Sequence, residues 1–222
     1  MRVLGFLALT VLFSANAFAV PIHWNTWASP SSGSLTTGSS TVTVTFATSN
    51  FHTRMPNYPS WLPANTYADG VLVDNGPAQS NGIMQLSGGT ANLNTLTFST
   101  PVVDPVFAIW SLGQTGIQAS FDFVGLAPVF VAGGPSAEYG GSAITVVGNT
   151  VNGREGNGTI QFIGTFSSIQ WTNPVFEFWY GFDVGIADVG TTVQVPEPDP
   201  LFLFVLGLGL LIGFRGLARS RG

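Results

Sequence analysis

The chain has 222 residues, of which 45% are hydrophobic, 13% aromatic and only 8% charged, and it contains no cysteine. This composition excludes intrinsic disorder and a fold held by disulfides. Lysine is absent, and between Val20 and Val195 two arginines stand against nine acidic residues, a net charge of −7. Such a surface repels phosphate backbones, so nucleic acid is not an expected partner.

The amino terminus has the parts of a secretory signal peptide. Met1-Arg2 gives a short basic start, an apolar run follows from Val3 to Phe13, and Ala17 and Ala19 form an A-x-A pattern. Small side chains at these two positions suit signal peptidase, so cleavage is predicted after Ala19. The run is too short for a transmembrane helix, and a buried core strand at Met1 is the disfavoured alternative. Residues 1–19 are therefore predicted to direct export.

Residues 20–194 have the pattern of one all-β domain. In TVTVTFAT, Val42, Val44 and Phe46 alternate with threonines, which predicts a half-buried strand. Further short strands are predicted at Thr95–Ser99, Pro105–Leu112, Ile117–Val124, Pro128–Ala132, Ala143–Val147, Gly158–Gly164, Ser168–Thr172 and Phe176–Ala187. Turns rich in Gly, Pro and Asn separate them, and no helical period is sustained. We therefore predict a single antiparallel β-sandwich or jelly-roll-like domain.

Some parts of this domain fit the strand pattern less well. Ser29–Ser40 and Met55–Pro63 are rich in Ser, Thr, Gly and Pro, and we interpret them as long loops of the same domain. Trp24, Trp27 and Trp61 lie in loop-like segments and are expected to pack against the sandwich. Gly181 and Gly185 inside the last strand predict a bulge or a bend.

The carboxyl terminus contains a candidate membrane helix. Leu201 to Phe214 is an apolar run of 14 residues, about 21 Å long as a helix, which is short for a bilayer core of about 30 Å. Counting residues 200–218 brings the helix within range, because an arginine at its end reaches the headgroups. By the positive-inside rule the basic residues place this end in the cytoplasm. They are Arg215, Arg219 and Arg221.

The order of features after the domain resembles the PEP-CTERM sorting signal. Val195, Pro196, Glu197 and Pro198 form the Pro-Glu-Pro motif, and the apolar helix and the arginines follow it at the extreme end of residues 195–222. Asp199-Pro200 departs from the small or hydroxylic residues that are commoner there. The two prolines keep the motif extended, as a protease cleft requires, and stop the helix from growing backward. No LPxTG motif is present, and a GPI signal would end in its apolar tail.

This resemblance implies where the protein goes. Members of the family are exported by Gram-negative bacteria and processed by a membrane protease called exosortase. The chain would be anchored transiently in the inner membrane by its C-terminal helix and then reach the cell surface or the extracellular matrix. The stretches PVFAIWSLGQ, EGNGTIQFIGTFSSIQWT and NPVFEFWYGFDVGI are also similar to a recurrent globular domain of such proteins, one without an assigned biochemical activity.

Residues with catalytic potential are few. His52 is the only histidine placed to act as a base, without a G-x-S-x-G elbow nearby, and a solvated loop histidine is the favoured interpretation. A pair of carboxylates could hydrolyse glycans, with candidates at Asp122, Glu138, Glu155, Glu177 and Asp183, although each also fits a turn or a polar strand face. No calcium loop and no nucleotide motif is recognisable. We therefore expect no enzymatic activity, no cofactor and no metal.

The aromatic residues suggest one binding mechanism. Strict alternation in FEFWYGFDVGI places Phe176, Phe178, Tyr180, Phe182, Val184 and Ile186 on one face of a strand. Trp179 then shares the other face with Glu177 and Asp183. An exposed indole beside carboxylates forms a glycan platform, because a sugar ring stacks on the indole and its hydroxyls bond the acids. The competing interpretation is that Trp179 belongs to the core, as expected for Trp171.

Three functions remain open from the sequence. The favoured one is a PEP-CTERM surface or extracellular-matrix protein whose β-sandwich associates with exopolysaccharide. The second is a secreted glycan hydrolase, which requires two acids converging in a cleft with the pKa of one raised. The third is a purely structural matrix component. Exposed aromatics without the acid pair would indicate binding, and the absence of both would indicate a structural role.

Overall fold

The computed structural model describes residues 21–38, 40–57 and 59–187, all within one compact unit that spans Ala17–Val189. Sixteen strands and three short 3-10 turns make up this part of the chain, which contains no α-helix. The all-β prediction is confirmed. No helix among these residues is long and apolar enough to cross a membrane. The predicted signal peptide, sorting motif and helix at 200–218 lie outside the described residues.

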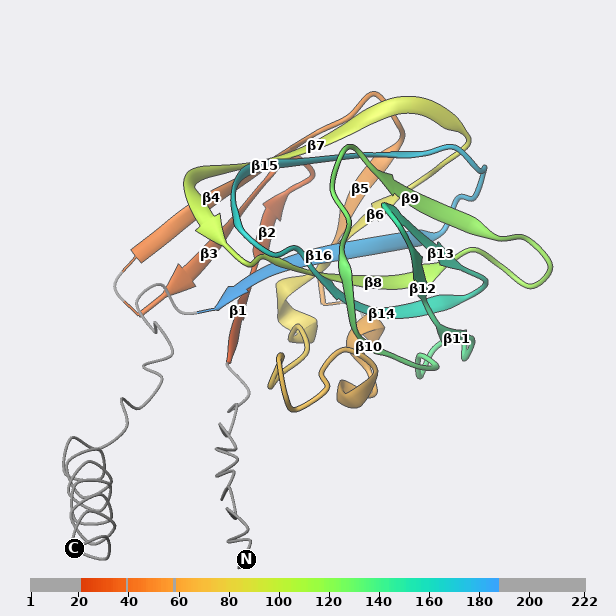
Figure 1. Cartoon of the computed structure of the whole chain (residues 1–222), viewed down its shortest axis with the longest axis horizontal. Coiled ribbons are helices and arrows are strands. Elements are labelled where there is room, and N and C mark those ends of the chain that lie inside the picture. Colours follow the sequence, from red (N-terminus) through yellow and green to blue (C-terminus); the bar gives the residue numbers. More distant parts are fainter. Residues whose placement is uncertain (1–20, 39, 58, 188–222) are drawn as a thin grey trace, which may run out of the picture. The chain divides into compact units, whose positions relative to one another are not determined.

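The first sheet has eight strands, and the last described strand runs through its centre (Figure 1). Its main order is β10 (Val129–Gly133), β14 (Gly156–Gln161), β8 (Val106–Leu112), β16 (Tyr180–Ala187), β6 (Ile83–Leu86) and β5 (His52–Met55). Beside it, β1 (Ile22–Trp24) pairs with β16, and β11 (Ser142–Ala143) pairs with β14. The β11–β14 pair is parallel, and the other pairs of this sheet are antiparallel.

The second sheet also has eight strands, all paired antiparallel. Its order is β12 (Thr145–Val147), β13 (Thr150–Gly153), β9 (Ala119–Phe123), β15 (Thr165–Asn173), β7 (Thr90–Val103), β4 (Ser40–Ala47), β3 (Ser32–Thr37) and β2 (Thr26–Ser29). As predicted, Val42, Val44 and Phe46 of β4 are buried. The two sheets form a β-sandwich.

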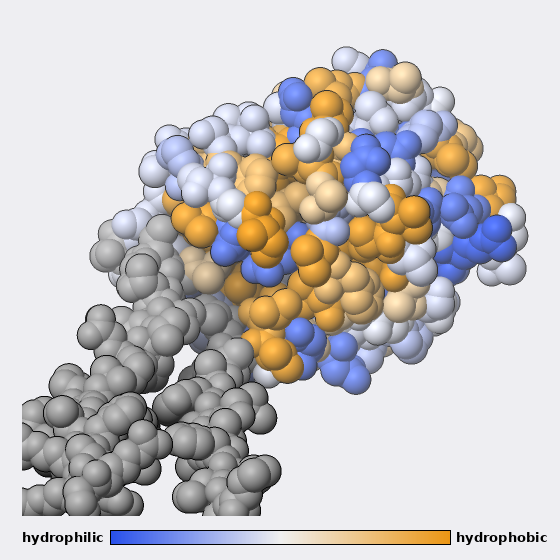
Figure 2. Space-filling view, in the orientation of Figure 1, coloured by the Kyte–Doolittle hydropathy of each residue, from blue (hydrophilic) through white to orange (hydrophobic). Residues whose placement is uncertain are grey.

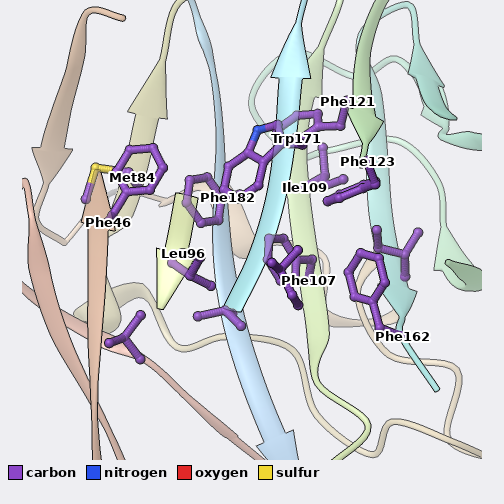
Figure 3. Packing of buried hydrophobic residues seen from close by; sticks show 14 of the residues in the cluster. Phe46, Met84, Leu96, Phe107, Ile109, Phe121, Phe123, Phe162, Trp171 and Phe182 are labelled. Atoms are coloured by element: carbon purple, nitrogen blue, oxygen red, sulfur yellow. The ribbon is translucent and has the colours of Figure 1, made fainter. Parts of the chain in front are cut away.

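An aromatic core lies between the sheets (Figure 3). Phe182 of β16 stacks on Phe107 of β8 at 5.7 Å, and its edge meets Trp171 of β15 at 5.2 Å and Phe46 of β4 at 5.4 Å. These ring contacts join strands from both sheets. The expectation that Trp171 belongs to the core is confirmed, because its side chain is fully buried.

The outer face of the first sheet is also apolar. Along β8, Val106, Ala108 and Trp110 alternate with the residues that face the second sheet, so they point to the opposite side. They pack with Trp61 and Tyr67 from the segment between β5 and β6. This segment contains the turns η1 (Pro59–Trp61), η2 (Ala64–Thr66) and η3 (Gln79–Asn81). The loop predicted at Met55–Pro63 thus begins a cover for this sheet.

Some expectations about loops were wrong. Ser29–Ser40 is not a loop but contains β3, which buries Leu35 and pairs with β4 over its whole length. Trp24 and Trp27 likewise lie in strands, although both are buried as expected. Small polar residues have weak strand propensity, and here the pairing partner overrides it.

The glycines of β16 were predicted to mark a bulge or a bend, and the register contradicts the bulge. The register of β16 with β8 runs without a shift through Gly181 and Gly185, so neither marks a bulge. A Cβ on Gly185 would overlap the Ile22 side chain, and one on Gly181 would lie 2.7 Å from the Ile83 side chain. Both glycines therefore make room for large side chains of neighbouring strands.

Candidate functional site

A pocket of about 280 Å³ lies where β16 begins. Its polar wall consists of Ser111, Gln114, Glu155 and Glu177. Its aromatic wall consists of Tyr139, Phe176, Phe178 and Trp179. These residues come from the end of β8, the β10–β11 loop, the β13–β14 turn and the segment before β16. Aromatic side chains and two carboxyl groups thus share one concave surface, which we call the Glu155–Glu177 pocket.

Two residues of the pocket have an unusual backbone. Ser111 has φ +53° and Glu155 has φ +55°, and they are two of the four described non-glycine residues with positive φ. This left-handed conformation costs on the order of 1–3 kcal/mol per residue and is concentrated at functional sites. The two side chains meet, because Ser111 Oγ donates a hydrogen bond to Glu155 Oε2 at 2.7 Å. Glu155 is thereby oriented by a strained neighbour.

Asn157 holds the parts of the pocket together. Its side chain is fully buried, and its Oδ1 accepts the Ser111 backbone N–H at 2.8 Å. Its Nδ2 donates to the carbonyl oxygens of Glu155 at 2.9 Å and of Gly140 at 3.2 Å. The second of these bonds fixes the loop that carries Tyr139. Asn157 therefore positions both walls without lining the pocket.

Glu177 is the buried carboxyl group of the pocket, with 6% of its surface exposed. Its Oε2 accepts the Gly113 backbone N–H at 2.5 Å. Burial raises the pKa of Glu177 to about 7; the Gly113 N–H lowers it in part, and the charge of Glu155 raises it further. Near neutral pH this carboxyl group can hold or release a proton.

The aromatic wall is partly open to solvent. Trp179 is half-buried, and its Nε1 donates to the Tyr139 hydroxyl at 3.1 Å. Phe176 and Phe178 are 67% and 50% exposed. Phe178 stacks on Phe51, with ring centroids 5.3 Å apart. Aromatic surface therefore continues from the pocket onto the neighbouring surface.

Only two of the three residues predicted to form a glycan platform lie together. Trp179 and Glu177 line the same pocket, but Asp183 is fully buried and contributes nothing to it. The predicted alternation begins only at Tyr180, where the strand begins; before it, Phe176 and Phe178 are exposed and Glu177 is buried. The chain before β16 is not paired as a strand, so the two-residue period does not apply there.

The other predicted acids and His52 lie elsewhere. Asp122, Glu138 and Asp183 do not line the pocket, whereas Glu155 and Glu177, both candidates for a carboxylate pair, do. His52 is not a loop residue but lies half-buried in β5, with its Nδ1 2.9 Å from the Asn50 carbonyl oxygen. Within the described residues no group of three or more His, Asp and Glu side chains could hold a metal ion.

Residues that sequence reasoning missed complete the pocket. No sequence pattern pointed to Tyr139, because it lies in a loop that is closed by backbone hydrogen bonds between Ser136 and Gly140. Ser111 lies at the end of an apolar strand, so the sequence pattern indicates a core residue and not a pocket residue. The strained backbone of Ser111 could not be foreseen either, since positive φ is expected of glycine and not of serine.

Exposed apolar residues alone do not identify a site on this protein. Figure 2 shows apolar residues in several patches between hydrophilic ones on the face in view. Side chains such as Val147 (69% exposed) and Ile163 (64%) are as open as Phe176. A second pocket, of about 320 Å³, is lined by His23, Trp24, Asn75 and neighbouring residues, none of them acidic. Carboxyl groups and aromatic rings occur together in the Glu155–Glu177 pocket.

Comparison with protein-family models, with curated proteins and with solved structures gave no match for this chain.

Proposed function

We propose that this is an exported PEP-CTERM protein whose β-sandwich associates with exopolysaccharide through the Glu155–Glu177 pocket. One observation carries the binding part: partly exposed aromatic rings and two carboxyl groups line the same pocket. A sugar ring presents an apolar face that stacks on an indole or phenol, and its hydroxyls donate hydrogen bonds to carboxylates. Trp179 and Glu177 would supply these two contacts.

The sorting part of the proposal rests on the two ends of the sequence. The signal peptide would export the body, and the C-terminal helix would hold it in the inner membrane until exosortase acts at Pro196-Glu197-Pro198. The body would then remain at the cell surface or in the extracellular matrix. Retention there by a polymer fits a domain with a saccharide pocket.

A pull-down tests the binding proposal. The chain from Val20 onward, purified in detergent, is incubated with exopolysaccharide from the producing organism. We expect the parent chain to be retained by the exopolysaccharide. For Trp179→Ala, with folding unchanged, the amount retained should fall at least tenfold. Phe130→Ala is the matched control, because Phe130 is 43% exposed and does not line the pocket. Equal loss in both variants, or no retention of the parent chain, would contradict the proposal and leave a structural role.

Glycan hydrolysis is a second candidate, and it is favoured because Glu155 and Glu177 line the same pocket. With its pKa near 7, Glu177 could protonate the leaving oxygen of a glycosidic bond. Glu155 would take a proton from a water molecule that attacks the anomeric carbon, so the bond is replaced by two hydroxyl groups. This candidate predicts new reducing ends in purified exopolysaccharide, and Glu177→Gln should abolish them, whereas Phe130→Ala should not.

A further inference from the structure

The ionisable carboxyl groups that line the Glu155–Glu177 pocket make it negatively charged. Two carboxyl groups line it, and none of its lining residues is basic. The chain has no lysine, and Arg154, which precedes Glu155, does not line the pocket. The negative charge of Glu155 is close enough to Glu177 to raise the pKa of its carboxyl group. A ligand carrying a positive charge would relieve this repulsion.

The aromatic wall suits the same kind of ligand. A cation gains energy over the face of a Trp or Tyr ring, by about 0.5–2 kcal/mol depending on how dry the site is. Trp179 and Tyr139 are joined by a hydrogen bond of 3.1 Å and stand in the pocket together. Carboxylates facing aromatic rings form the usual surroundings of a bound ammonium group.

The size of the pocket limits the ligand to a small unit. Its volume of about 280 Å³ lies just below the range of about 300–1,000 Å³ that is typical for pockets of drug-sized molecules. Space of this order fits a single sugar residue of a chain. The exposed Phe178 and the stacked Phe51 offer apolar surface for a neighbouring residue of the same chain.

We propose that the pocket recognises a protonated amino sugar: a hexosamine residue with a free amine, whose ammonium lies against Glu155 and Glu177 and whose ring packs on Trp179. This inference rests on the proposed function and narrows it to polysaccharides with unacetylated amino groups. An acetylated amine has no charge to pair with the glutamates, and a uronic acid would add a third negative charge. Both classes are therefore excluded ligands.

Ammonium binding should displace a proton. A cation beside Glu177 favours its ionised form, whereas burial in the empty pocket raises its pKa to about 7. Three groups interact electrostatically with Glu177. The charge of Glu155 raises its pKa, the Gly113 N–H lowers it, and Glu177 in turn raises the pKa of Tyr180. The pKa of Glu177 is therefore expected to fall on binding, so that Glu177 releases a proton while any unprotonated ligand amine takes one up, and Glu177→Gln should remove the contribution of Glu177 to the net exchange.

Isothermal titration of the chain from Val20 onward tests the proposal with two oligosaccharides of equal length, one of glucosamine and one of N-acetylglucosamine. We expect the glucosamine oligomer to bind at least tenfold more tightly at pH 7 and to lose affinity with added salt. Glu155→Gln should weaken it at least tenfold, and Phe130→Ala should leave it unchanged. Repeating the titration in buffers of different ionisation enthalpy measures the net number of protons exchanged, and the difference between the parent chain and Glu177→Gln gives the contribution of Glu177.

The outcomes separate this inference from the proposed function. Equal affinity for both oligomers, or unchanged affinity in Glu155→Gln, would overturn the amino-sugar inference and leave saccharide binding standing. The amino-sugar inference is also overturned if neither oligomer binds while exopolysaccharide is retained in a Trp179-dependent way. If neither the oligomers nor exopolysaccharide is retained, the inference and the proposed function both fail.

Discussion

At the scale of single residues, the buried carboxyl groups determine how stability responds to pH. Asp183 is fully buried in β16, with its Oδ1 accepting the Val184 backbone N–H at 2.9 Å. Burial raises its pKa well above the usual value, and the Val184 N–H and the side chains of Asn25 and Trp27 offset only part of that rise. The folded state therefore prefers the protonated acid.

Replacing Asp183 with Asn should stabilise the protein at neutral pH. Because the folded pKa is raised, the wild type has its full stability below the unfolded pKa of about 3.9 and loses it as pH rises toward the folded pKa. Asn keeps an oxygen for Val184 and carries no charge. Thermal unfolding at pH 4 and pH 8 is the measurement. The variant should gain more at pH 8, and an equal or smaller gain there would show that Asp183 is not held neutral.

Glu177 should impose a second pH dependence. Its folded pKa of about 7 lies above its ordinary value of 4.5, so the wild type should lose stability as pH rises between these values and level off above pH 7. Glu177→Gln retains an acceptor for the Gly113 N–H and should flatten this part of the curve. Urea denaturation from pH 4 to pH 8 records it. Parallel curves for the two proteins would refute the raised pKa.

At the scale of elements, β16 depends on close approach by its neighbours. Gly185 lies beneath β1, and a Cβ there would overlap Ile22 and lie 2.9 Å from Trp24 Cε3. Asn75 also holds β1 in place, since its side chain bonds both the N–H and the carbonyl of Ile22. The first strand of the body is therefore seated closely against the last.

Gly185→Ala should lower the free energy of unfolding by about 1–3 kcal/mol, because the added methyl must displace β1. Gly38→Ala is the control, since no atom lies within 4 Å of the Cβ it would add. Urea denaturation measures both. Combining Gly185→Ala with Ile22→Ala removes the overlapping side chain, and the double variant should lose less than the sum of the two single losses. Additive losses would contradict the steric explanation.

At the scale of the whole body, one aromatic core joins the two sheets. Phe182 contacts rings of β4, β8 and β15, which belong to both layers. The sandwich should therefore unfold as a single cooperative unit.

Phe182→Ala should lower the free energy of unfolding by about 3–5 kcal/mol, the usual cost of a large cavity in a core. Tryptophan fluorescence and far-ultraviolet circular dichroism should report the same transition in urea. Phe130→Ala, at an exposed position, should change stability by less than about 0.5 kcal/mol. Two separate transitions would show that the sheets do not depend on each other.

The pocket and the two ends of the described body lie at opposite ends of β16. Ile22 pairs with Ala187, so the first and last described strands end side by side (Figure 1). Four of the pocket residues, 176–179, directly precede Tyr180 at the other end of β16, about 23 Å from Ala187 at 3.3 Å per residue. A ligand in the pocket would thus be held far from Ala187, the last described residue.

Much of the fold follows from short-range patterns in the sequence. Alternation of apolar and polar residues in β4 and apolar runs such as that of β8 identify strands, because a strand has a period of two residues and a buried strand is apolar throughout. Strands such as β3 were missed, since their residues form strands only when a neighbour supplies the hydrogen bonds.

The sequence alone determined the all-β class, the approximate limits of most later strands and the acidic, lysine-free character of the surface, because these depend on composition and local periodicity. Only the tertiary structure decided that Glu155 and Glu177 share a pocket while Asp183 is buried. The pocket depends on loops that are far apart in the sequence and on the hydrogen bonds of the buried Asn157 side chain. Residues that strand pairing brings together share no local sequence pattern that would identify them as neighbours.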